Sequence, residues 1–186
     1  MVKLDSKEKK ISEIILLVHP LYYLRDKENL SKIEKLNARL LLGAWGKELK
    51  DTAKNPRAIV VFVLPGSSFR HNWFNPLFNP RLKRFVLFAK RMFGDRFFFV
   101  DRSIDPEKLS GRISKRGFVF DRKTLAGRSF GEYWNLCVRM QTERIVKTIG
   151  FGVESIRPIY DLSLDFHKTN KQSKQRIRKR PNIRRK

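Results

Sequence analysis

The chain has few acidic residues for its size. Of its 186 residues, 18 are Asp or Glu and 42 are Lys or Arg, so the formal net charge at pH 7 is +24. A surplus of this size exceeds what solubility requires and indicates a polyanionic partner. Nucleic acid is the first candidate for that partner, with a membrane surface as its rival.

Cysteine, histidine and long apolar runs are also scarce. The single cysteine, Cys137, excludes an internal disulfide and fits a reducing, cytoplasmic environment. The three histidines lack metal-ligand spacing, and neither a Walker pattern nor Gly-x-Gly-x-x-Gly occurs, so we expect no metal and no cofactor. No run approaches the roughly 18 apolar residues of a spanning helix, and we expect no membrane partner.

Two unbroken apolar runs, Ile14–Val18 and Ala58–Leu64, have the length and composition of strands that are buried on both faces. We predict that the second is the central strand of a parallel sheet. Further strands are expected at 96–100 and 117–120. The segment 155–166 alternates apolar and polar residues around Pro158, which is typical of an edge strand.

Helices are predicted between these strands. Spacings typical of capping boxes, at Ser31/Glu34 and Ser129/Glu132, predict helices that end near Asn55 and Ile149. The segment 80–93 begins at a proline and ends before Gly94, which predicts a third helix. Residues 111–117 are expected to form a basic loop.

The alternation of strand and helix predicts an α/β fold, three-layered and Rossmann-like, with a mostly parallel sheet of about five strands and helices on both faces. Its C-terminal strand would be an antiparallel or an edge strand. We expect a single domain over residues 1–166, and a basic extension over 167–186 that stays disordered until bound.

The extension has the composition of an arm that follows a phosphate backbone. Its last nineteen residues include ten Lys or Arg and no acid, and removing these charges still leaves +14 on the rest of the chain. A targeting signal is the alternative reading. The predicted backbone contacts are Lys171, Lys174, Arg176, Arg178, Lys179, Arg180, Arg184, Arg185 and Lys186.

The segment 66–79 is long for a connection in a compact α/β unit. We predict that its aromatic residues stack on bases, and the competing interpretation is that they plug the end of the sheet; these residues are Phe69, Trp73 and Phe74. Ser67, Ser68 and Arg70 are predicted to bind phosphate.

Polar residues follow four of the predicted strands. If these ends share one rim of the sheet, an acid, a base and two cations would meet there. This predicts His19, Asp101 and Asp121 as acid/base residues and Arg102 and Arg122 as anion-binding residues. The competing interpretation is that the aspartates only turn the chain. Cys137 lies in an apolar stripe and is interpreted as a core thiol.

The function predicted from these patterns is nucleic-acid binding, with RNA or a ribonucleoprotein preferred, because no DNA-binding motif is present and exposed aromatics suit unstacked bases. The extension and the basic faces of helices 80–93 and 129–149 would give the affinity. One alternative is a hydrolase or transferase acting on a phosphorylated or nucleic-acid substrate at the strand ends. The other is a scaffold protein in a larger particle; the oligomeric state is not indicated.

Overall fold

The computed structural model describes residues 8–20, 32–64, 80–101, 107–133, 137–152 and 156–164. It is an α/β fold in which five parallel strands form the main sheet in the order β4-β3-β2-β6-β7. These strands are β2 (Glu13–Val18), β3 (Ala58–Leu64), β4 (Phe97–Asp101), β6 (Ala126–Tyr133) and β7 (Ile156–Leu164).

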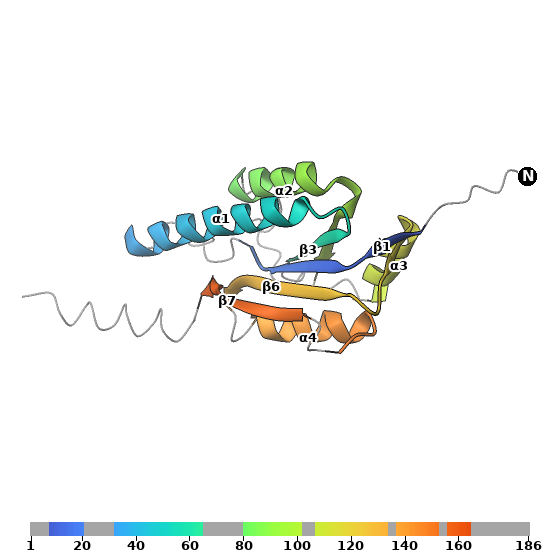
Figure 1. Cartoon of the computed structure of the whole chain (residues 1–186). Helices are drawn as coiled ribbons and strands as arrows, with labels where there is room; N and C mark the ends of the chain where they lie inside the picture. Colours follow the sequence, from blue (N-terminus) through green and yellow to red (C-terminus); the bar gives the residue numbers. More distant parts are fainter. Residues whose placement is uncertain are drawn as a thin grey trace, which may run out of the picture.

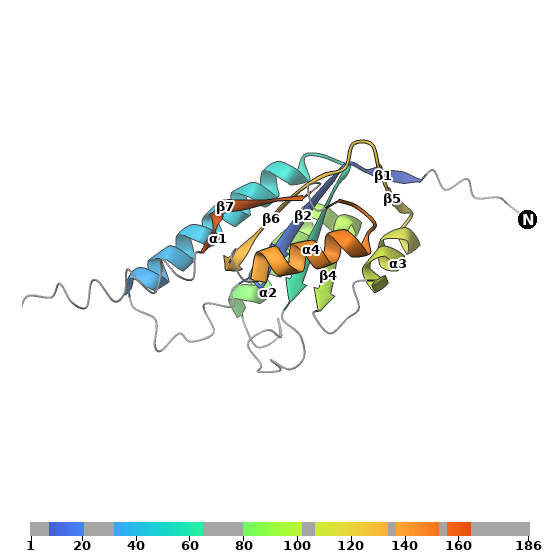
Figure 2. The same cartoon turned by 90° about the horizontal axis from the view of Figure 1, so that it is seen from below.

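Helices cover both faces of this sheet (Figures 1 and 2). On one face lie α1 (Lys32–Ala53) and α2 (Pro80–Phe93), and on the other lies α4 (Arg139–Thr148). A 3₁₀ turn, η3 (Gly94–Arg96), joins α2 to β4. The predicted three-layer arrangement is therefore confirmed for the described residues.

A separate two-stranded sheet extends from the amino end of the main sheet (Figure 2). It pairs β1 (Lys9–Ile11) with β5 (Phe118–Phe120) in parallel, and α3 (Glu107–Lys115) leads into β5. The pattern did not predict β1, because its three residues include two lysines. It also predicted a loop where α3 continues to Lys115; the apolar pair Leu109 and Ile113, four residues apart, buries one helix face there.

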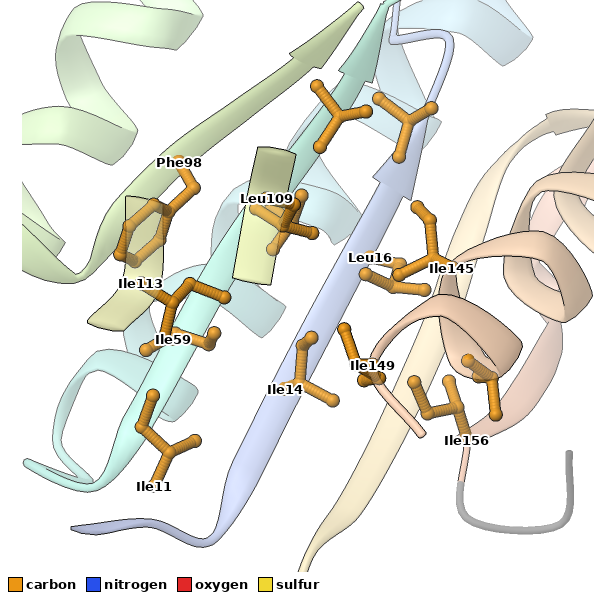
Figure 3. Packing of buried hydrophobic residues seen from close by; sticks show 14 of the residues in the cluster. Ile11, Ile14, Leu16, Ile59, Phe98, Leu109, Ile113, Ile145, Ile149 and Ile156 are labelled. Atoms are coloured by element: carbon orange, nitrogen blue, oxygen red, sulfur yellow. The ribbon is translucent and has the colours of Figure 1, made fainter. Parts of the chain in front are cut away.

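Buried aliphatic residues form the core under α4 (Figure 3). Alternate residues of β2, beginning with Ile14 and Leu16, face Ile145 and Ile149 of α4. The core on the α1/α2 face combines aliphatic residues with many aromatic ones. There Trp45 of α1 is 6.3 Å from the Phe85 ring of α2, and Phe62 of β3 is 5.7 Å from the same ring.

The central strand is β2, so the prediction that Ala58–Leu64 is central is wrong by one position. β3 lies between β2 and β4 and is buried on both faces all the same, with Ala58 to Val63 fully inaccessible. An apolar run shows that a strand is covered twice, but not which such strand is in the middle.

The predicted helix from Ser129 is also wrong, since residues 126–133 form strand β6 and α4 begins only at Arg139. Ser129 pairs with Leu16 in the register of β2, and Phe130 is buried in the core on the opposite face. Alternation in β6 is hidden in the sequence because its residues on the α4 face are small.

The predicted bounds of α2 are confirmed at both ends, and Gly94, which ends it, has φ 55°. β7 lies at the edge of the sheet, as predicted, and it pairs with β6 in parallel, so the antiparallel alternative is wrong. The predicted loop 66–79 and the extension 167–186 lie outside the described residues.

Candidate nucleic-acid interface and strand-end rim

His19 lies at the carboxyl end of the central strand. Its backbone N–H donates to the Val63 carbonyl at 2.8 Å, which continues the pairing of β2 with β3. The residue is buried, and its φ of 50° is in the left-handed region that non-glycine residues seldom adopt. In parallel sheets, ligands bind where neighbouring strands send their connections in opposite directions, which here is between β2 and β6.

Asp101, the last residue of β4, is on the same rim. Two strand spacings, about 10 Å, separate it from β2 in the plane of the sheet. His19 and Asp101 therefore share a rim, although β3 lies between their strands.

Asp121 does not lie on this rim, which corrects the expectation that the four strand ends converge. It follows β5, and its backbone N–H donates to the Ile11 carbonyl at 2.8 Å, just before β2 begins. Six residues of β2 put it roughly 20 Å from His19. β5 pairs with β1 rather than joining the main sheet, so its end falls on the opposite side.

The Asp121 carboxylate is held by its neighbours in the chain and by Arg57. A hydrogen bond from the Thr124 side chain, one from the Lys123 backbone N–H and the Arg57 guanidinium 2.7 Å away lower the pKa of Asp121 below its ordinary value. This aspartate stays ionised and ties the turn after β5 to the start of β3. Arg122 beside it is exposed.

Several predicted site residues lie outside the described residues. These are Arg102, the phosphate and stacking candidates of the 66–79 segment, and the cations of the extension, namely Ser67, Ser68, Phe69, Arg70, Trp73, Phe74, Lys171, Lys174, Arg176, Arg178, Lys179, Arg180, Arg184, Arg185 and Lys186. Cys137 is described; it is half-buried at the start of α4 and packs against the aliphatic core, where a core thiol was predicted.

Part of the positive charge is structural, which the sequence did not reveal. The Arg96 guanidinium donates to three carbonyls, those of Asn55 at 2.6 Å, Ala58 at 2.9 Å and Ala53 at 3.1 Å, and burial lowers its pKa. It thereby ties the end of α1 to the start of β3. These carbonyls are preorganised acceptors, so this cation is not available to a polyanion.

Arg128 of β6 is also used internally. It forms ion pairs with Glu13 of β2 and Glu48 of α1, and it donates to the Thr52 hydroxyl at 3.1 Å. Elsewhere Asp51 pairs with Lys54, and the contact between them lowers the pKa of Asp51. Five acids of the described segments therefore pair with cations outside α2, namely Glu13, Glu48, Asp51, Asp121 and Glu143.

The outer face of α2 is different. Lys83, Arg84, Lys90 and Arg91 are all exposed, and the helix contains no acidic residue. Within the described ranges, no carboxylate lies within ion-pair distance of these four side chains. At 1.5 Å per residue they cover about 12 Å of helix. We call these four residues the α2 cation face.

The α2 cation face continues onto α1. The ammonium of Lys50 on α1 is 5.8 Å from the ring centroid of Phe88 on α2, and Lys47 one turn earlier is exposed. Because Phe88 lies three or four positions from Arg84 and Arg91, Lys50 is close to the arginine side of α2. Lys50 therefore extends the α2 cation face onto α1, where the neighbouring exposed acid, Asp51, pairs with Lys54.

The opposite helix layer has less unpaired charge. On α4, Arg139 pairs with Glu143 at 3.0 Å, which leaves Arg144 and Lys147 as exposed cations. Across the described segments, no group of three or more His, Cys, Asp or Glu side chains is arranged to hold a metal ion, and none of the helices described is long and apolar enough to cross a membrane.

Comparisons of the chain with protein-family models, with curated proteins and with solved structures returned no match.

Proposed function

We propose that this protein binds nucleic acid, RNA in preference to DNA, through the α2 cation face and the basic extension. The observation that carries the proposal is the run of four exposed cations on α2 with no acid in the helix and no ion-pair partner among the described residues. Cations that are not neutralised by the protein can displace counterions from phosphates, which gives salt-dependent affinity.

The preference for RNA comes from the shape of the helix layer. α1 lies side by side with α2, and their side chains touch through Trp45 and Phe85 (Figure 1). Packed helices are 8–10 Å apart, so the pair forms a broad face, whereas the major groove of B-DNA, about 12 Å wide, admits one helix. A broad basic face suits strands whose phosphates are reached without groove insertion.

An enzyme acting on a phosphorylated substrate is supported less. The rim with His19 and Asp101 does not include Asp121 or Arg122, so the set of acid/base and anion-binding groups that motivated this alternative is divided between two ends of the sheet. A scaffold role in a ribonucleoprotein particle is compatible with the same surface.

The test is a salt titration of binding to a labelled single-stranded RNA, measured by fluorescence anisotropy. Replacing Arg84 and Arg91 by alanine should weaken binding roughly tenfold near 0.1 M salt and reduce the salt slope by about 1.4, because each lost contact on a single strand removes about 0.7.

The matched control is Arg144→Ala with Lys147→Ala on α4, which removes the same charge from exposed positions on the other face. It should change the affinity much less. Absence of RNA binding at low salt, absence of a salt slope, or an equal loss in the two variants would reject the proposal.

A further inference from the structure

Leu87 is an exposed apolar residue in the middle of the α2 cation face. It is 54% exposed and lies opposite the buried side of α2, which carries Val86 and Ala89. With about 100° per residue, Lys83 and Lys90 flank it on one side and Arg84 and Arg91 on the other. All four cations are three or four positions away, so they border Leu87 directly.

The other large exposed apolar residues in helices of the described segments lack this setting. At these spacings Leu40 of α1 has no cation, and Leu36 has cations, Lys32 and Arg39, on one side only. Met140 of α4 has Glu143 three positions on. A lone exposed leucine needs no explanation. A leucine bordered by two cation rows is different, because an anionic ligand bound by the cations also covers the leucine and displaces its hydration water.

We propose that Leu87 packs on an unpaired base of single-stranded RNA, and that α2 thereby prefers single strands to duplex. This inference depends on the proposed function and adds to it a preference for single strands over duplex. The phosphates follow the arginine row, which continues onto α1 through Lys50, and a base turns inward over Leu87. The lysine row then faces the outer edge of that base, where its carbonyl and ring-nitrogen acceptors are found.

Duplex RNA does not offer this contact, because its bases are stacked and its narrow major groove excludes side chains. A membrane fits less well, because an interfacial helix presents a wide apolar face to the bilayer, whereas the apolar side of α2 packs on the sheet. Among the α2 side chains that the structure describes, Leu87 is the one exposed large apolar residue. Single-stranded RNA accounts for both the charge and the isolated leucine.

The experiment compares the full chain with its Leu87→Ala variant on a single-stranded RNA and on a blunt duplex of the same length, at several salt concentrations. Half of a leucine side chain is available for burial, so Leu87→Ala should weaken single-strand binding roughly fivefold at every salt concentration. The salt slope and the duplex affinity should not change, because no charge is removed.

Leu40→Ala is the matched control, since Leu40 is 63% exposed on the same helix layer and has no cation three or four positions away; it should bind like the parent protein. Circular dichroism should give the same spectrum for all three proteins. The inference is overturned if Leu87→Ala leaves single-strand binding unchanged, weakens both RNAs equally, or instead reduces binding to phosphatidylserine vesicles. If the parent protein binds no RNA at all, the proposed function itself has failed.

Discussion

Gly131 of β6 is the residue whose identity the fold constrains most directly. A Cβ built on it would lie 2.1 Å from the carbonyl oxygen of Val18 on β2, and backbone on a central strand cannot move aside. We expect Gly131→Ala to destabilise the protein by about 3 kcal/mol or more, the upper range for overpacking. Urea unfolding followed by circular dichroism measures this.

Gly43 on α1 provides the contrast, because nothing lies within 4 Å of a Cβ there. Gly43→Ala should stabilise the protein by up to about 1 kcal/mol through helix propensity. Similar urea midpoints for the two variants would show that β6 does not approach β2 as closely as described.

The sequence does not show which arginines are used in internal hydrogen bonds and which are exposed to solvent. Arg91 and Arg96 are five positions apart, yet the first is exposed on α2 while the second is bonded to three carbonyls. The difference arises because Arg96 lies where the ends of α1, α2 and β3 meet, and that meeting point is set by the packing of segments distant in sequence.

At the scale of elements, α3 covers the open edge of β4. The Arg116 guanidinium donates to the carbonyls of Asp95 at 2.8 Å and Phe97 at 2.9 Å, and Arg112 donates to Phe99 at 3.2 Å. Residues 112 and 116 are about one helical turn apart, and residues 97 and 99 are one strand repeat apart. The spacing of the two arginines therefore matches the spacing of the carbonyls that they bind. Unpaired edge carbonyls are otherwise a template for association with another chain.

Replacing Arg112 and Arg116 by alanine should therefore expose the β4 edge. We expect a loss of roughly 1–3 kcal/mol of stability, from the hydrogen bonds, and concentration-dependent association in sedimentation velocity. Lys108→Ala with Lys115→Ala removes the same charge from exposed positions of α3 and should remain at the parent's association state. Association of both variants would point to net charge rather than to the strand edge.

Elements were predictable where local signals and burial agree. α2 has a proline start, a glycine stop and a stripe of apolar residues, and its bounds were predicted at both ends. β6 has the opposite character: Gly127, Ser129 and Gly131 face α4, so the strand lacks the bulky alternation that marks other strands, and its serine and glutamate resemble a helix start. Tertiary packing against β2 decides its conformation.

At the scale of the molecule, the candidate rim was only partly predictable. The rule that parallel strands end on one side is correct for β2 and β4, and it would have held for Asp121 had β5 joined the main sheet. Which strand pairs with which is a long-range property, and the chain gives no sign before Gly117 that the next strand will pair with β1. The expectation of a polyanionic partner needs no topology, because it comes from net charge alone, and it stays a prediction.

The basic extension and the folded body should contribute separately to RNA binding. The extension carries ten of the cations, and the rest of the chain keeps +14, so deletion of residues 168–186 should leave salt-dependent binding with a smaller slope. In the truncated chain, Arg84→Ala with Arg91→Ala should cause the same fold loss as in the full chain, because distant phosphate contacts are independent and their free energies add. Anisotropy titrations of the full and truncated chains, each with and without the two substitutions, give the salt slopes and the fold losses in affinity. If truncation alone removed binding, the α2 cation face would have no role of its own; if the two losses failed to add, the extension would lie across α2 and compete with RNA for the same cations.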